Sequence, residues 1–166
     1  MKAVVIYDSS FGNTAKIAQA ISNRLSNEAG DVELRQVGDV KPEQLLGLDV
    51  LIVGSPTQRC RPTPATSDFL KRIPKNALKG VKVAGFDTRF TQEKITSFGV
   101  VASKLLNLIG YAAKPISKRL KKKGGNVAIP PEGFYVDDTE GPLMEGELER
   151  AAAWAGQILV KEKEVQ

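Results

Sequence analysis

The chain has 166 residues, of which 42% are hydrophobic and 26% charged, values typical of a globular protein rather than a disordered or membrane-embedded one. This length suits one domain with a full core, so we expect a single domain over residues 1–166. No apolar run approaches the ~20 residues of a membrane helix, and the first residues resemble a strand rather than a signal peptide. We therefore expect a cytoplasmic protein that does not bind membranes.

Two residue types narrow the possible chemistry. Histidine is absent, which removes Ser-His-Asp and Cys-His catalysis and the usual zinc ligand sets. Cys60 is the only cysteine, so neither an intrachain disulfide nor a Cys-rich metal cluster is possible. We expect no metal site and no catalytic side chain, and any chemistry should depend on a bound cofactor.

The first half of the chain alternates predicted strands and helices. Residues 2–7 and 49–54 are short apolar runs without alternation, which predict strands buried in the middle of a parallel sheet. Apolar residues at helical spacing predict a helix over 13–28. Alternating residues at 32–37 predict a strand at the edge of the sheet, and a short helix is expected near 42–46.

The second half continues this alternation. It contains a helix after the loop 55–64, a strand at 81–86, a helix at about 94–109, a basic helix at about 112–123, a buried strand at 127–129, an extended piece at 134–136 and a helix at about 144–162. The last helix is expected to bury Leu148, Ala152, Ala155 and Leu159. The order predicts an α/β fold, a doubly wound parallel sheet of five strands in the order 2-1-3-4-5 with helices on both faces.

The loop after the first strand, residues 8–14, is the strongest functional signal. A helix that begins just after a strand directs its free backbone N–H groups at whatever lies above the strand end. Gly12 lets the backbone come close, and the neighbouring hydroxyl and amide side chains add donors, which favours a phosphate. Neither the lysine-containing loop of nucleoside triphosphate sites nor a triple-glycine dinucleotide fingerprint is present.

The chain resembles a flavodoxin over essentially its whole length. The resemblance depends on Ser10-Phe11-Gly12-Asn13-Thr14 after the first strand, Gly54-Ser55-Pro56-Thr57 after the third, Asp87-Thr88-Arg89-Phe90 after the fourth, and Glu140-Gly141-Pro142-Leu143 before the last helix. It implies a flavodoxin-like fold, FMN as the cofactor, and electron transfer between redox partner proteins. Uncharged donors would then hold the charge of the phosphate through N–H dipoles.

The resemblance also assigns cofactor-binding residues. The first loop is expected to hold the FMN phosphate through Ser9, Ser10, Phe11, Gly12, Asn13 and Thr14. The other two loops are expected to flank the isoalloxazine ring with Ser55, Pro56, Thr57, Gln58, Arg59, Cys60, Asp87, Thr88, Arg89 and Phe90.

The chain departs from the flavodoxin pattern in its aromatic residues and its charge. The loop 55–64 has neither tryptophan nor tyrosine, and Phe90 is the only aromatic residue of the fourth-strand loop. The chain has 24 basic and 19 acidic residues, a net charge of +5, whereas flavodoxins are commonly acidic. We hypothesise that its flavin is reduced more easily than in an acidic flavodoxin. A reduction potential as low as in that class would refute this.

Two other functions on the same sheet type fit the sequence poorly. A receiver domain needs an aspartate at the end of the third strand, where this chain has Gly54-Ser55. The phosphate loop of small tyrosine phosphatases needs an arginine six residues after its cysteine, and Thr66 stands there. An electron carrier is our first interpretation. The alternatives are an NAD(P)H-dependent FMN or quinone reductase and a flavin-less binding module, and whether the protein is an enzyme in its own right stays open.

Two segments concern partners. The basic helix carries lysines four apart from Lys114 to Lys122, with Lys123 at its end, and either faces solvent or docks an acidic redox partner. No aromatic residues interleave with these lysines, so nucleic acid is an unlikely partner. The apolar segment 95–109 is either a lid, a homodimer contact or internally packed.

Overall fold

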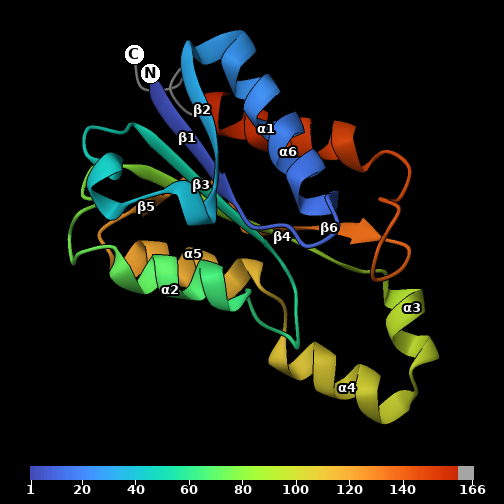
Figure 1. Cartoon of the computed structure of the whole chain (residues 1–166). Helices are drawn as coiled ribbons and strands as arrows, with labels where there is room; N and C mark the ends of the chain where they lie inside the picture. The colour runs from blue at the N-terminus through green and yellow to red at the C-terminus, as the bar shows by residue number, and fades with distance from the viewer. Residues whose placement is uncertain (161–166) are drawn as a thin grey trace.

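The computed structural model describes residues 1–160, which form a six-stranded parallel sheet (Figure 1). Five of the strands follow the order β2-β1-β3-β4-β5, and β6 also pairs with β4. The strands are β1 Lys2–Tyr7, β2 Asp31–Gln36, β3 Val50–Pro56, β4 Lys82–Phe90, β5 Asn126–Val127 and β6 Glu132–Val136. The α/β class and the order 2-1-3-4-5 are confirmed.

The prediction of five strands was wrong by one, because the edge beyond β4 is made of two short strands. β5 pairs with Lys82 and Val83 of β4, and β6 pairs further along with residues 86–90. Pro130 and Pro131 lie between β5 and β6 and have no N–H to donate to a ladder, so the edge is interrupted there. The extended piece expected at 134–136 is the second half of β6.

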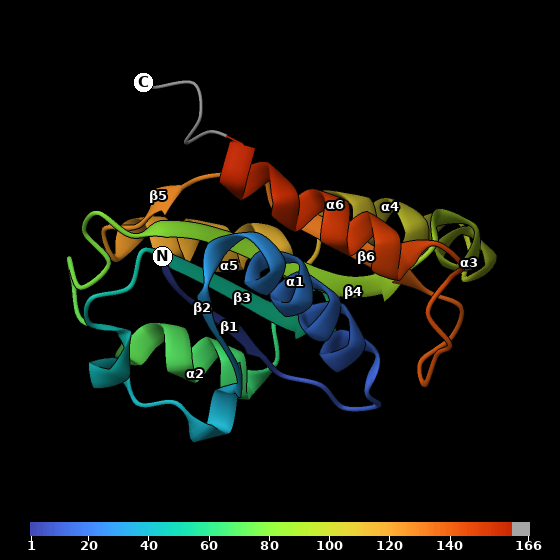
Figure 2. The same ribbon diagram turned by 90° about the horizontal axis from the view of Figure 1, so that it is seen from above.

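Two pairs of helices cover the two faces of the sheet (Figure 2). α1 Asn13–Ala29 and α6 Glu147–Val160 pack side by side on one face, and α2 Pro64–Arg72 and α5 Ala113–Lys122 on the other. The apolar residues Ile17, Ile21 and Leu25 of α1 are fully buried, as their spacing predicted. Two single turns of 3₁₀ helix, Val37–Asp39 and Pro42–Leu45, connect β2 to β3.

The predicted helix 94–109 is two helices, α3 Gln92–Ser97 and α4 Val100–Ile109, which together we call the α3–α4 arm. Gly99 separates them with a φ of 105°, a backbone angle that favours glycine. The arm extends from the carboxyl end of β4 away from the sheet (Figure 1). No residue of α4 is buried, so the interpretation that the segment packs internally was wrong for this helix.

The last helix also differs from the prediction. α6 begins at Glu147 rather than near residue 144, and residues 161–162 of the predicted helix lie outside the described range. Leu148, expected in the core, is 42% exposed. Ala155 is buried as predicted, and Ala152 and Leu159 are partly buried. The rest of the buried face carries Ala151, Trp154 and Ile158. No helix within residues 1–160 is long and apolar enough to cross a membrane.

Candidate functional site

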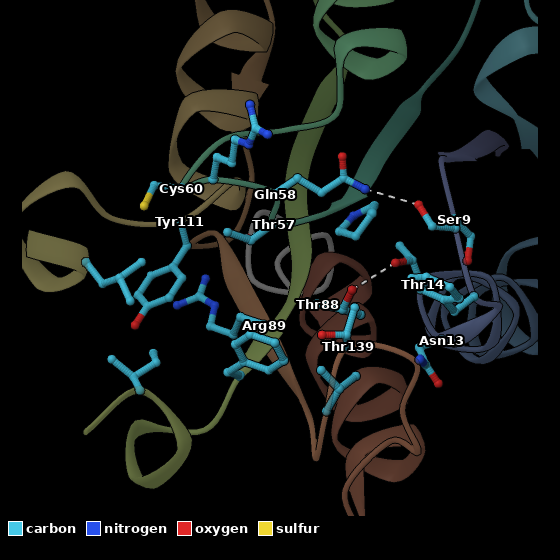
Figure 3. Close-up of a pocket in the computed structure, with 18 of the residues that line it drawn as sticks. Ser9, Asn13, Thr14, Thr57, Gln58, Cys60, Thr88, Arg89, Tyr111 and Thr139 are labelled. Atoms are coloured by element: carbon cyan, nitrogen blue, oxygen red, sulfur yellow. Dashed lines mark hydrogen bonds between the residues drawn. The ribbon is translucent and has the colours of Figure 1, made fainter. Parts of the chain in front are cut away.

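A cleft with a volume of about 210 Å³ lies at the carboxyl ends of β1, β3 and β4 (Figure 3). This is the place in the sheet where the strand order reverses, which is the usual ligand site of such folds. The predicted residues that line the cleft are Ser9, Ser10, Phe11, Asn13, Thr14, Pro56, Thr57, Gln58, Arg59, Cys60, Thr88, Arg89 and Phe90. Gly12, Ser55 and Asp87 were predicted as well but do not line it.

The loop between β1 and α1 forms a cradle of backbone donors at one end of the cleft. The Ser9 hydroxyl accepts the N–H groups of Gly12 at 3.1 Å and Ala15 at 3.3 Å, and so holds the loop in a tight turn. In this loop and the first turn of α1, the N–H groups of Ser10, Phe11, Asn13 and Thr14 have no acceptor within residues 1–160. We call these residues the phosphate cradle. An anion held there would meet N–H dipoles and the positive end of α1.

The phosphate cradle is fixed by hydrogen bonds to segments far along the chain. The hydroxyls of Thr14 and Thr88 lie 2.8 Å apart and tie the cradle to β4 (Figure 3). The Gln58 amide donates to the Ser10 hydroxyl at 3.1 Å, and the Asn13 amide donates to the Glu140 carbonyl at 3.1 Å. Because these bonds come from different segments, the donors hold their positions before any ligand arrives.

Asp8 has a structural place beside the cradle. Its carboxylate accepts the Thr63 hydroxyl at 2.5 Å and the Ser9 N–H at 2.9 Å. Thr63 also caps α2, since its hydroxyl oxygen accepts the Thr66 N–H. Asp8 therefore ties the first loop to the start of α2.

The segment after β3 crosses the cleft as a tight turn. Arg59 and Cys60 have φ angles of 49° and 65°, and Gln58 and Arg61 exchange backbone hydrogen bonds of 2.9 and 3.0 Å on either side of them. Two consecutive left-handed residues form the kind of two-residue turn in which asparagine and glycine are usual. Other residues adopt this conformation at a cost of about 1 kcal/mol each. The strained turn places Arg59 and Cys60 in the cleft wall.

Residues 87–90, predicted as a loop, belong to β4 because β6 pairs with them. The Asp87 side chain is completely buried and accepts the Ala113 N–H at 2.7 Å. Its carboxylate also accepts two hydrogen bonds from Arg89, from Nε and Nη2, each of 2.7 Å. Burial raises the pKa of Asp87 above 3.8, an effect that outweighs the lowering by Arg89. Asp87 thus does not line the cleft but holds Arg89 and the start of α5 in position beneath it.

Sequence reasoning missed one wall of the cleft. That wall consists of Ile95, Phe98 and Leu106 of the arm, Tyr111 before α5, Val136 at the end of β6, and Thr139. Phe90 was the only aromatic residue expected in the fourth-strand loop, and other segments add two more: the Phe98 ring lies 5.8 Å from the Phe90 ring, and Tyr111 also lines the cleft. These residues come from segments without a local motif, so only their apolar character was visible in the sequence.

The two ends of the cleft suit the two ends of FMN. The cradle offers uncharged N–H donors in a shape that fits a phosphate. The opposite end is apolar and aromatic, as a flat ring system requires. The residues present therefore fit this cofactor.

Comparison with known proteins agrees with the fold and the cleft. The family model of the flavodoxin domain matches residues 4–119. A flavodoxin of Maridesulfovibrio salexigens is 31% identical over 116 residues, which cover 60% of this chain and 80% of that protein. The chain is thus related by sequence to flavodoxins.

Solved structures have the same fold over nearly the whole chain. Oxidised Flavodoxin 2 from Bacillus cereus is 22% identical, with a TM-score of 0.75 over 97% of this chain and 99% of that one. Rubredoxin oxygen:oxidoreductase from Desulfovibrio gigas is 19% identical, with a TM-score of 0.73 over 99% of this chain and 37% of that one. The fold therefore occurs both alone and as part of a longer chain.

Fold and cleft define a doubly wound α/β protein with a ligand cleft at the point where the strand order reverses. The family match extends over most of the chain, and the chain belongs to the flavodoxin family. Its cofactor is FMN and its function is electron transfer.

Proposed function

We propose that the phosphate cradle holds the FMN phosphate and that the apolar end of the cleft holds the isoalloxazine ring. The observation that carries this proposal is the set of four free N–H groups of the cradle at the mouth of an apolar cleft. The proposal includes the predicted residues of the first loop and of both strand ends. Gly12, Ser55 and Asp87 then act by shaping the cleft, since they do not line it.

When bound, FMN supplies the ring that accepts and releases electrons. The chain contributes position, orientation and exclusion of water. The cradle fixes one end of the cofactor through N–H donors. Phe90, Phe98 and Tyr111 offer aromatic surface at the other end, and the turn at Arg59 and Cys60 limits the cleft on the side of β3.

Titration of the apoprotein with FMN and with riboflavin tests this assignment. Riboflavin has the same ring but no phosphate, so it cannot use the cradle. We expect the fluorescence of FMN to be quenched on binding at micromolar concentration. FMN should bind roughly 100-fold more tightly than riboflavin, because riboflavin lacks the charged phosphate and so cannot form several N–H bonds to it. Equal affinities would contradict the role of the cradle, and no quenching by FMN would contradict the proposal as a whole.

We propose further that the protein is a carrier without a substrate of its own. A carrier receives electrons from a separate reductase, whereas a reductase on this fold oxidises NAD(P)H unaided. We expect no NADH or NADPH oxidation by the purified FMN-loaded protein with a quinone as acceptor. Rapid unaided oxidation would support the reductase alternative.

We propose also that the protein is located in the cytoplasm, where the free thiol of Cys60 stays reduced.

An acidic redox partner is proposed to dock at the α5 end nearest the cleft. The helix has no acidic residue, and Lys114, Lys118 and Arg119 are exposed. Its first residue, Ala113, donates its N–H to Asp87. Its last turn leads into β5, which pairs with the start of β4, at the end of that strand away from the cleft. Lys114 and Lys118 are therefore closer to the cofactor cleft than Lys121 and Lys122 are.

The salt dependence of electron transfer tests this docking site. Rim charges act mainly on the association rate and are screened by salt. We expect Lys114→Gln to slow reduction of an acidic partner more than Lys122→Gln does, and the difference to vanish at high ionic strength. Equal rates for both variants at low salt would contradict docking at this end of α5.

The arm is proposed to be the contact between two copies of the chain. Val101 and Leu108 of α4 are 81% and 84% exposed, and Lys104 is the only charged residue of the helix. Monomers rarely expose contiguous apolar patches larger than a few hundred Å². A second copy of α4 fits this surface, because two such faces can meet across a two-fold axis with Lys104 at the margin.

Light scattering at increasing protein concentration tests the dimer. We expect the wild type to dimerise and Leu108→Glu to be monomeric, because a dimer would bury the new carboxylate. Leu46→Glu is the matched control, since Leu46 is 68% exposed and lies outside the arm. A wild type that stays monomeric at all concentrations, or a control that disrupts the dimer equally, would overturn this proposal.

A further inference from the structure

Arg89 is fixed by the fold at the edge of the cleft. Its guanidinium donates to both carboxylate oxygens of Asp87, and Asp87 is itself held by the Ala113 N–H. A bidentate pair of this kind determines the plane of the guanidinium as well as its position. Arg89 therefore differs from an ordinary surface arginine, whose side chain samples several rotamers.

Two further contacts complete this arrangement. The Arg89 Cζ lies 3.9 Å from the centre of the Tyr111 ring, a cation–π contact. On the sheet, a Cβ atom at Gly133 of β6 would overlap the guanidinium, so only glycine leaves room for it there. The side chain of Arg89 is 19% exposed and lines the cleft (Figure 3).

One edge of the guanidinium remains available to a ligand. Nε and Nη2 are bonded to Asp87, whereas Nη1 has no acceptor among the described residues. The Asp87 carboxylate is completely buried, so the positive partner of this pair is the one that borders the cleft. The only charged residues that line the cleft in residues 1–160 are Arg59 and Arg89.

A fixed cation in this place distinguishes the two redox forms of a flavin. The oxidised isoalloxazine ring is neutral. Uptake of two electrons from a redox partner and one proton from solvent leaves the ring with one negative charge. A cation in a partly water-excluded cleft stabilises the negative form and has little effect on the neutral form.

We propose that Arg89 stabilises reduced FMN relative to oxidised FMN in this cleft. This inference rests on the proposed function, because it requires the ring to occupy the apolar end of the cleft. Arg89 acts by charge, and Asp87, Tyr111 and Gly133 act by holding that charge in place. Arg59, which is exposed at the turn, is more strongly screened by solvent.

Binding of both redox forms tests this role. The dissociation constants of the apoprotein for oxidised FMN and, without oxygen, for chemically reduced FMN are measured, and their ratio is compared between variants. We expect Arg89→Gln to lower the preference for reduced FMN roughly tenfold, and Arg89→Lys to retain most of it. Lys75→Gln, which changes the net charge equally but lies in the exposed segment before β4, at the opposite end of that strand from the cleft, should leave the ratio within twofold of the wild type.

A second variant moves the ratio in the opposite direction. Asp87→Asn removes the counter-charge behind Arg89 while an amide oxygen can still accept one of its hydrogen bonds, so the preference for reduced FMN should rise. A purely structural role would weaken both forms equally in every variant, and an unchanged ratio in Arg89→Gln would overturn the inference. If the wild-type apoprotein binds neither oxidised nor reduced FMN, the proposed function itself is overturned.

Discussion

The two ends of the cleft are built differently. The phosphate cradle is polar, and hydrogen bonds from β4, from the turn at Gln58 and from the segment at Glu140 hold it. The α3–α4 arm is apolar, and α4 has no buried residue. The arm is fastened mainly through α3, by buried Ile95 and by an ion pair of 3.1 Å between Lys94 and Asp138. One end of the cleft is therefore preorganised, and the other leaves an apolar helix free for a partner.

Truncation of one buried and one exposed side chain should give the largest contrast. Ile17 of α1 is fully buried next to the cradle, so Ile17→Ala should lower the free energy of unfolding by about 2–5 kcal/mol. Leu108→Ala should change it by less than about 0.5 kcal/mol at concentrations where the chain is monomeric. Urea denaturation measures both. A comparable loss in Leu108→Ala would show that α4 is packed in the monomer.

A carboxylate introduced into the cradle should nearly abolish cofactor binding. Ser10 is exposed, so Ser10→Asp is expected to fold, but its charge would repel the phosphate and weaken FMN binding roughly 100-fold. Ser10→Ala, the matched control, should weaken binding only a few-fold. Fluorescence titration of the apoproteins gives both affinities. Tight FMN binding by Ser10→Asp would show that the phosphate lies elsewhere.

The bond that ties the cradle to β4 should have a measurable share in stability. Thr14 and Thr88 are both buried, and Thr14→Val would leave the Thr88 hydroxyl without this partner. We expect a loss of about 1–3 kcal/mol in the free energy of unfolding. In a double-mutant cycle, Thr14→Val with Thr88→Val should lose less than the sum of the single variants. Strict additivity would mean that the two hydroxyls do not interact.

The carboxylates of Asp87, beneath the cleft, and Asp138, beside the arm, should change the pH dependence of the free energy of unfolding in opposite directions. The pKa of Asp87 is raised by burial, so the folded chain binds more protons and the free energy of unfolding falls as the pH rises above 3.8. The pKa of Asp138 is lowered, first by the Thr139 N–H and then by Lys94. Its contribution is therefore present above 3.8 and is lost as the pH falls through the folded pKa.

Denaturation at a series of pH values separates these two effects. In the wild type, Asp87 makes the free energy of unfolding fall as the pH rises, and Asp87→Asn should abolish this fall. Asp138 makes the free energy of unfolding rise with pH, and Asp138→Asn should abolish that rise, which is the smaller effect because Asp138 is exposed to solvent. The same pH slope in Asp87→Asn and the wild type would show that burial does not raise the pKa of Asp87.

The cradle was predictable because its parts are contiguous in the chain. An apolar strand is followed directly by a loop with Gly12 and by a helix whose Ile17 and Ile21 face inward, so the position of the loop follows from adjacent residues. Element ends were harder to predict. Residues 87–90 are strand because β6 pairs with all four and β3 also pairs with Asp87 and Thr88, and the helix expected at 94–109 is broken at Gly99. Leu148 was expected in the core because its spacing matched, but α6 begins just before it and faces inward through Trp154.

The sequence by itself determined the α/β class and the cradle, because hydrophobic spacing and helix starts depend on neighbouring residues. Tertiary structure alone decided the rest of the cleft. Tyr111 and Phe98 reach it from segments without a motif, and Gly133 leaves room for Arg89 from the neighbouring strand. Such contacts depend on how distant segments pack together, so they cannot be predicted from the spacing of residues within one segment.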